Sequence, residues 1–269
     1  MATILLPTDF SDAALNAAKF ALDLFGTEGN KFILVHTYLM PSYDNVLLPS
    51  IGDIPEREAI NRTRRVERIL RKFAKNVKLG RKVSRVSLVR LLNELDESKG
   101  VDMVVMGTQG EGNYGMVGKN ARSVVSDCTA PVITVPAQWK AEPVERIMLA
   151  YDGKELDRFT LNPLLELVDR RNAEIAITHV RYTVPGLELL PDRKKLEDVF
   201  TGVKHSFLTV QGNDVIKTID ELATQGRIQM VAVVHRQMGF WKRLFHGSTA
   251  KRMTLHTSLP MLVLPERPR

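Results

Sequence analysis

The chain has 269 residues, 44% of them hydrophobic and 26% charged, with a formal net charge of +7 and a pI near 9.5. This composition excludes a disordered protein, and the length suits two domains of about 130 residues, each large enough to bury a core. Because no apolar stretch approaches the roughly 18 residues of a membrane span and no signal-peptide pattern begins the chain, we expect a cytoplasmic protein.

The first half alternates short apolar runs with helical patterns. We expect strands at residues 3–8, 31–37, 82–87, 101–107 and 131–136. Runs of Val, Ile and Leu without polar alternation are typical of strands covered on both faces, as in a parallel sheet between helices. Residues 40–55, rich in Pro, Ser, Gly and Asp, are expected to be a loop insertion.

A helix is predicted to begin near Glu56. Its expected buried stripe recurs at spacings of four and three: Ala59, Thr63, Val66, Leu70, Phe73 and Val77. A basic stripe is expected on the opposite, solvent face: Arg57, Asn61, Arg64, Arg68, Arg71, Lys75 and Lys78. Such a stripe could attract nucleic acid or an acidic partner, but no nucleic-acid motif accompanies it and aromatics make up only 6%. A solvated face is therefore the favoured interpretation.

The second half repeats the first. Its expected strands are residues 146–151, 174–180, 203–210, 230–235 and 260–265. Gly118 and Gly247 are 129 residues apart, as are Pro131 and Pro260, whereas Asp9 and Asp152 are 143 apart. Self-similarity of this kind indicates a duplicated domain. We predict two α/β domains, each a five-stranded parallel sheet with helices on both faces, at residues 1–139 and 144–269, joined by a polar linker.

The residues with binding chemistry follow two strands of the first half. Asp9 comes directly after the first strand, and a glycine-rich segment from Gly107 to Asn120 follows the fourth. Loops at the carboxyl ends of parallel strands form the ligand site of an open sheet. Glycine backbone, the charge of Lys119 and a helix N-terminus capped by Asn120 together suit a phosphate group.

These motifs resemble the universal stress protein family in its tandem form, over nearly the whole chain. The resemblance rests on PTDFSDAALNAAKFA, on VVMGTQG with its later glycine, helix and PV segment, and on HGSTAKRM. It implies strand order 3-2-1-4-5, pairing of the last strands of the two halves, and binding of ATP or AMP, with Mg²⁺ as a candidate companion ion. The implied ligand residues of the first half are Thr8, Asp9, Val35, Met106, Gly107, Gly110, Gly118, Lys119 and Asn120.

Both halves depart from the family signature, which is Gly, two residues, Gly, nine residues, and Gly followed by Ser or Thr. In the first half, only seven residues separate Gly110 from Gly118, and Lys119 replaces the hydroxyl residue. In the second half, His235 and Met238 are expected at the positions of the two leading glycines, while the final glycine and hydroxyl residue of the signature are kept. We expect a degenerate second site whose remaining ligand residues, suited to adenosine or AMP, are Asp152, Gly247, Ser248 and Thr249.

The sequence gives little support for a metal site, a reactive thiol or a catalytic site. His205, His235, His246 and His256 fit no common metal-ligand spacing, and Cys128 is expected to be a buried thiol. The DFSD sequence before a helix is ordinary N-capping, so no turnover enzyme is predicted. The leading hypothesis is a stress-response regulatory protein that binds an adenine nucleotide chiefly in its first domain. The alternatives are an interaction protein without nucleotide and a slow ATPase. We expect a protein partner and no association with a membrane, and homo-oligomers are compatible with the sequence.

Overall fold

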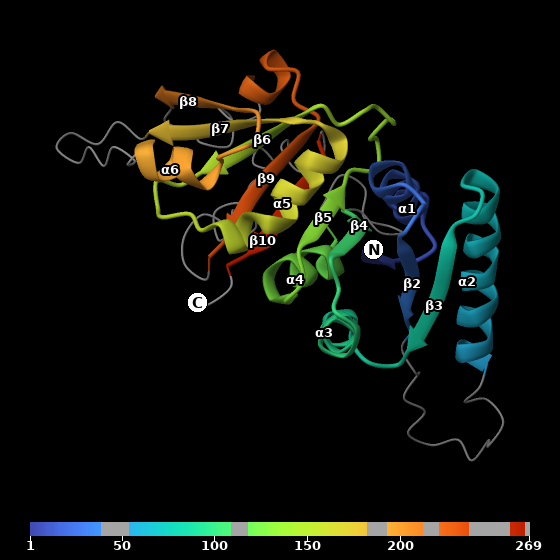
Figure 1. Ribbon diagram of the computed structural model, residues 1–269. Helices are drawn as coiled ribbons and strands as arrows, with labels where there is room; N and C mark the ends of the chain where they lie inside the picture. Colours follow the sequence, from blue (N-terminus) through green and yellow to red (C-terminus); the bar gives the residue numbers. More distant parts are fainter. Residues whose placement is uncertain (39–53, 109–117, 182–192, 212–220, 237–258, 267–269) are drawn as a thin grey trace. The chain divides into compact units, whose positions relative to one another are not determined.

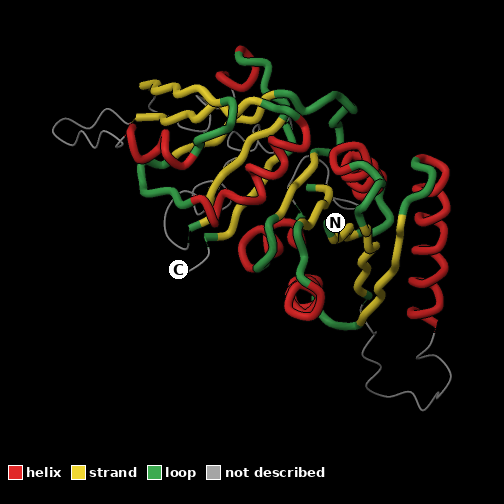
Figure 2. The backbone as a smooth tube through the Cα atoms, in the orientation of Figure 1, coloured by secondary structure: helices red, strands yellow, loops and turns green. Residues whose placement is uncertain are grey.

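The structure is a computed structural model that describes residues 1–38, 54–108, 118–181, 193–211, 221–236 and 259–266. It divides into two compact units, Met1–Ala130 and Pro131–Arg269. Strands and helices alternate along each unit (Figures 1 and 2). Most of the predicted loop insertion at residues 40–55 lies outside the described residues.

The first unit contains four parallel strands in the order β3-β2-β1-β4. The core of this unit includes fully buried strand side chains, among them Ile4, Leu5, Phe32, Leu34 and Val104. The elements are β1 (Thr3–Pro7), α1 (Asp12–Phe25), β2 (Lys31–Thr37), α2 (Ile54–Phe73), β3 (Lys78–Ser84), α3 (Leu88–Lys99), β4 (Met103–Gly107) and α4 (Lys119–Asp127). All four strands end at the edge where Asp9 and the glycine-rich segment follow.

Strand β3 lies earlier in the chain than the sequence predicted. It covers Lys78–Ser84 and pairs with β2 along its whole length, whereas the expected strand was 82–87. The physical reason is its position in the sheet: among the described strands β3 pairs only with β2, and its side chains are exposed or half-buried. Such a strand does not need the continuous apolar run by which strands were recognised.

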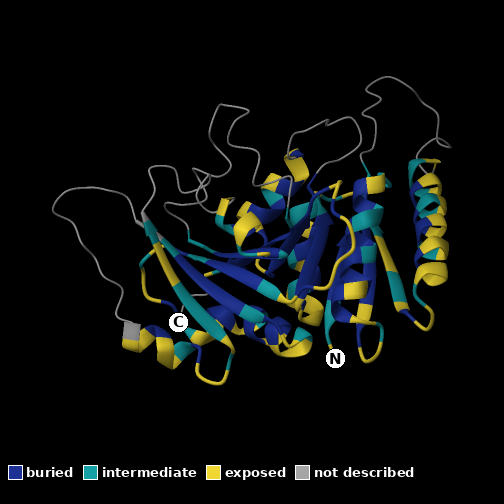
Figure 3. Cartoon of the chain, turned by 90° about the horizontal axis from the view of Figure 1, so that it is seen from above, coloured by how far each residue is buried: buried dark blue, intermediate teal, exposed yellow. Residues whose placement is uncertain are grey.

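Helix α2 follows the predicted stripe over most of its length. Ala59, Thr63, Val66 and Leu70 are buried, and the basic stripe is exposed, as Figure 3 shows for the helix. The prediction for Phe73 was wrong, because its side chain is 45% exposed. Phe73 is the last residue of the helix, and its ring lies under the Lys19 ammonium, 5.5 Å from the ring centroid.

The second unit has the strand order β5-β10-β9-β6-β7-β8. Its elements are β5 (Val132–Val135), β6 (Arg146–Tyr151), α5 (Arg158–Arg171), β7 (Glu174–Arg181), α6 (Arg193–Val199), β8 (His205–Gln211), β9 (Met230–His235) and β10 (Met261–Pro265). Strands β6 to β10 have the predicted 3-2-1-4-5 order, and β1 to β4 match its first four positions. Pairing of the two last strands is also confirmed, since β5 and β10 are antiparallel partners.

Two further features bear on function. Cys128 is buried at the end of α4, and its burial raises the pKa of the thiol to about 11, so it is protonated at neutral pH. This agrees with the predicted unreactive thiol. Within the ranges that the structure describes, no helix is long and apolar enough to cross a membrane.

Candidate functional site

The turn after β1 is built by short hydrogen bonds around Asp9. The Asp9 Oδ1 atom accepts from the Ser11 N–H at 3.0 Å and from the Ser11 hydroxyl at 2.6 Å. Ser11 in turn caps α1 by accepting from the Ala14 N–H. Phe10, between them, adopts a positive φ of 71°, which is uncommon for a residue with a side chain. The turn is therefore rigid, with Asp9 held at the carboxyl end of β1.

Gly107, the last residue of β4, lies against the start of α1. A Cβ atom at this position would stand 3.0 Å from the backbone C and O atoms of Ala13 and 3.2 Å from the Ala14 nitrogen. Backbone atoms cannot move aside as a flexible side chain can. The close approach of β4 to α1 thus requires glycine here, for packing alone.

The two ends of the glycine-rich segment meet beside this contact. The Gly118 N–H donates to the Thr108 carbonyl oxygen at 2.8 Å, and α4 begins immediately afterwards at Lys119. The cap residue is Gly118 rather than the predicted Asn120, and no side chain caps the helix. The first N–H groups of a helix have no partner within it, so Lys119, Asn120 and Ala121 present amides to the adjacent space.

A cavity of about 320 Å³ lies between these features, within the first unit. One part of its wall comes from the β1 and β2 ends, including Asp9, His36 and Thr37, and another from α4 and the end of β4. The apolar remainder includes Pro7, Ala14, Leu88 and Met106. Lys119 lines the cavity and does not fill it, so an open space exists where the sequence predicted a ligand.

One hydroxyl group in this wall is left without a partner. Thr108 is only 4% exposed, and its Oγ1 atom has no hydrogen bond among the described residues. Burying a hydroxyl without a partner costs about 1–3 kcal/mol, and a bound ligand or water removes that cost. Thr108 was not among the predicted ligand residues, although its place directly after Gly107 could have suggested it.

His36 was also missed by sequence reasoning, yet it lines the cavity. Its Nδ1 lies 2.7 Å from the Thr8 carbonyl oxygen, which can only accept, so Nδ1 carries the proton. Burial lowers the pKa of the imidazole, and the Arg62 charge lowers it further, against the Thr8 hydrogen bond and Asp9. The Phe10 ring lies 4.2 Å from the His36 ring, and the Arg62 guanidinium lies 4.3 Å from the Phe10 ring.

The structure brings most of the predicted ligand residues of the first half to the cavity. Seven line the cavity: Thr8, Asp9, Met106, Gly107, Gly118, Lys119 and Asn120. Val35 does not; its side chain is fully buried, and its carbonyl accepts the Thr8 N–H at 2.9 Å. Thr37, two residues on, lines the cavity instead. Gly110 lies outside the described residues, as do Gly247, Ser248 and Thr249 of the second half.

Comparison with known proteins identifies the fold family. The model of the universal stress protein family matches residues 1–136 and again residues 143–265. The chain belongs to the universal stress protein family. No curated protein matches the sequence.

Two solved structures agree with this tandem fold. A universal stress protein from Archaeoglobus fulgidus DSM 4304 is 17% identical, with a TM-score of 0.67, over 98% of this chain and 96% of that one. A functionally unknown protein from Pseudomonas aeruginosa PAO1 is 13% identical, with a TM-score of 0.60, over 98% and 92%. A universal stress protein in complex with cAMP is 20% identical over 51% of this chain and 98% of its own, with a TM-score of 0.35.

The second universal stress protein domain keeps the turn geometry of the first. The His179 Nδ1 lies 3.1 Å from the Tyr151 carbonyl oxygen, and His36 and Thr8 show the same 28-residue separation. Gly153, directly after Asp152, has a φ of 84°, close to that of Phe10. These matched residues are all 143 apart, so the histidine could have been found by extending the Asp9 and Asp152 alignment.

Strand pairing corrects one sequence expectation about the second domain. Leu5 pairs with Val104, and the corresponding Met148 pairs with Val231. Counting three residues further along each strand aligns Gly107 with Val234, not with the expected His235. The sequence alignment placed Gly107 and His235 128 residues apart, whereas paired residues of β4 and β9 differ by 127. The first-half segment from Gly107 to Gly118 is two residues shorter than the second-half segment from Val234 to Gly247.

An arginine occupies the surroundings of Asp152. The Arg236 Nε atom lies 3.7 Å from an Asp152 oxygen and 3.5 Å from a Glu266 oxygen, and Arg236 also donates to the Glu155 carbonyl at 2.6 Å. Its side chain is only 13% exposed. The carboxylate that corresponds to Asp9 is thus already paired with a cation of its own domain.

Proposed function

We propose that the first half of the chain binds an adenine nucleotide, ATP or AMP, in the cavity between the Asp9 turn and α4, and acts as a regulatory binding module in the cytoplasm. The observation that carries the proposal is the buried, unpartnered Thr108 hydroxyl in a cavity walled by helix-terminal amides and Lys119. Anions are favoured at such a helix terminus, since its N–H groups and dipole are unopposed.

The charges of the cavity favour one orientation of the nucleotide. Lys119 and the α4 terminus would hold the phosphates, and Thr108 would donate to a phosphate oxygen. Asp9 would repel phosphates, so the donor groups of ribose or adenine belong beside it. Thr37 and His36, at the end of β2 beside β1, also line the cavity. Mg²⁺ would be held mainly by the phosphates, because it needs few protein ligands.

We further propose that the second half holds no nucleotide. Arg236 neutralises Asp152, and Val234 stands at the strand position of Gly107. The matched substitutions Asp9→Ala and Asp152→Ala test both statements in one assay. ATP binding measured by titration calorimetry should involve one site per chain and weaken strongly with Asp9→Ala. The Asp152→Ala variant should bind as the parent chain does.

Two more variants separate binding from folding. Lys119→Gln removes a charge from the cavity wall and should weaken ATP binding about tenfold, with little change in AMP binding if Lys119 contacts the outer phosphates. Thr108→Val removes the orphan hydroxyl, so stability should hold or rise while nucleotide affinity falls. If Thr108→Val leaves affinity unchanged, the assignment of that hydroxyl to the ligand is wrong.

Thermal unfolding gives the decisive outcome for the whole proposal. ATP at 100 times its dissociation constant should add about 2.7 kcal/mol to the free energy of unfolding. No shift at millimolar ATP, together with no nucleotide in the purified protein, would leave the interaction-protein alternative. Regulatory binding without turnover predicts no phosphate release; release abolished by Asp9→Ala would instead support the slow ATPase.

A further inference from the structure

The positive charge of this protein is concentrated in one segment of the first unit. Residues 54–87 contain twelve Lys and Arg against three Glu, a net charge of +9, whereas the whole chain carries +7. The remaining residues are therefore slightly acidic together. This segment consists of α2, β3 and the turns that follow them, and Figure 1 shows α2 running beside β3.

The cations of α2 gather on one side of the helix. At 100° per residue, six of them fall within an arc of about 120°, opposite the buried stripe. All six are exposed: Arg57, Arg64, Arg65, Arg68, Arg71 and Lys72. Lys75, Lys78, Arg81 and Lys82 extend the exposed charge past the end of the helix and along β3. We call these ten residues the α2–β3 basic surface.

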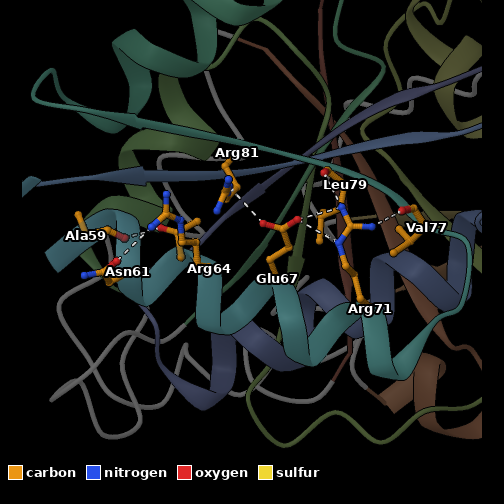
Figure 4. A network of polar contacts seen from close by, with 9 residues as sticks. Ala59, Asn61, Arg64, Glu67, Arg71, Val77, Leu79 and Arg81 are labelled. Carbon is orange, nitrogen blue, oxygen red and sulfur yellow. Dashed lines mark hydrogen bonds and ion pairs between the residues drawn. The ribbon is translucent and has the colours of Figure 1, made fainter. Parts of the chain in front are cut away.

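A small set of contacts holds this surface in place (Figure 4). Glu67, with 16% of its side chain exposed, lies 2.9 Å from Arg71 and 3.2 Å from Arg81. Arg71 also donates to the carbonyl oxygens of Val77 and Leu79, each at 3.2 Å. Two cations thus share one carboxylate, which joins α2 to β3 and leaves the junction positively charged.

Most of the surface has no acidic counterpart. Arg71 and Arg81 pair with Glu67, but within the described part of the chain no ion pair involves Arg57, Arg64, Arg65, Arg68, Lys72, Lys75, Lys78 or Lys82. A solvated helix face commonly alternates charges of both signs. The six exposed cations on one side of α2 repel one another, and a bound polyanion relieves that repulsion.

We propose that the α2–β3 basic surface binds the phosphate backbone of a nucleic-acid duplex without reading its bases. Six of its ten residues are arginine, whose planar guanidinium matches phosphate oxygens. Helix α2 is about 30 Å long and rigidly packed, so it suits a long, regular polyanion. Single strands are disfavoured because the one exposed aromatic of α2, Phe73, already lies under Lys19. A bilayer is disfavoured because the apolar stripe of α2 is buried.

The test is fluorescence anisotropy with labelled DNA and RNA duplexes of about 20 base pairs and unrelated sequence, without nucleotide. We expect micromolar binding that ignores sequence and weakens steeply with salt, with a log–log slope near −0.9 for each phosphate contacted. Because no nucleotide is added, this result does not depend on whether the cavity of the first unit binds a nucleotide.

The variant Arg57→Gln/Arg64→Gln/Arg68→Gln should lower duplex affinity at least tenfold and flatten the salt slope by about 3. Its helix should persist, because Gln and Arg have similar helix propensities. The control Lys99→Gln/Lys140→Gln/Lys194→Gln removes the same charge from exposed sites elsewhere and should stay within about twofold of the parent chain. Any of three results would overturn the proposal: equal losses of duplex affinity in both variants, no duplex binding at low salt, or binding only to phosphatidylglycerol vesicles.

Discussion

The turns at Asp9 and Asp152 share a backbone and differ in their surroundings. Each aspartate follows a central strand, each precedes a residue of positive φ, and each lies near a histidine bonded to the preceding carbonyl. Asp9 lines the cavity of its domain, and Asp152 lies 3.7 Å from the Arg236 Nε atom. The two halves have therefore kept the turn and its hydrogen bonds, which the fold needs. The residues that would contact a ligand have diverged between them.

The largest effect is expected at Gly107, where the two halves differ in the strand itself. Gly107→Ala would place a Cβ atom 3.0 Å from the Ala13 backbone, so α1 must shift. We expect a loss of about 3 kcal/mol in the free energy of unfolding, together with weaker nucleotide binding. Urea denaturation followed by circular dichroism measures the first quantity.

Gly80→Ala is the matched control for this change. Gly80 also lies in a strand, but its added Cβ would meet nothing closer than 3.9 Å. That variant should change stability by no more than about 0.5 kcal/mol. Equal costs for the two glycines would mean that the approach of β4 to α1 is not what requires Gly107.

A smaller effect is expected at Gly153, the residue that corresponds to Phe10. Its φ is 84°, and an added Cβ would lie 3.1 Å from the His179 Cε1 atom. Gly153→Ala should therefore cost about 2 kcal/mol, from backbone strain and displacement of His179. Gly202→Ala, with a φ of 83° and nothing within 4 Å, should cost only about 1 kcal/mol in the same urea titration.

The sequence predicted the fold well because repetition and buried strands leave strong patterns. Runs such as residues 31–37 and 230–235 became strands as expected, while β3 was misplaced because it is exposed and charged. The motifs predicted Asp9, Gly107, Gly118 and Lys119 as ligand residues, and all four line the cavity. Thr108 and Arg236 were not predicted, because an unpartnered hydroxyl and an ion pair between distant positions of the sequence depend on three-dimensional neighbours that spacing does not encode.

Arg236→Ala tests whether the second site is closed by its own arginine. The change removes two ion pairs and a hydrogen bond to Glu155, but Asp152 and Glu266 keep substantial exposure to water. We expect a cost of about 1 kcal/mol in thermal unfolding. ATP stoichiometry should stay at one per chain, because Val234 remains; a second binding site in this variant would show that Arg236 alone closes the second half.

The smallest effect concerns the pH dependence contributed by His36. Its pKa is lowered by burial, so the native state favours the neutral imidazole while the unfolded chain titrates near pH 6.5. The stability from this group is complete above about pH 6.5 and is lost as pH falls through the lowered native pKa. His36→Gln, whose amide can still donate to the Thr8 carbonyl, should flatten the urea-midpoint profile between about pH 7.5 and pH 5. The control variant His179→Gln leaves His36 untouched and should keep the pH profile of the parent chain. If the parent chain and His36→Gln have identical slopes, other groups cause the acid sensitivity.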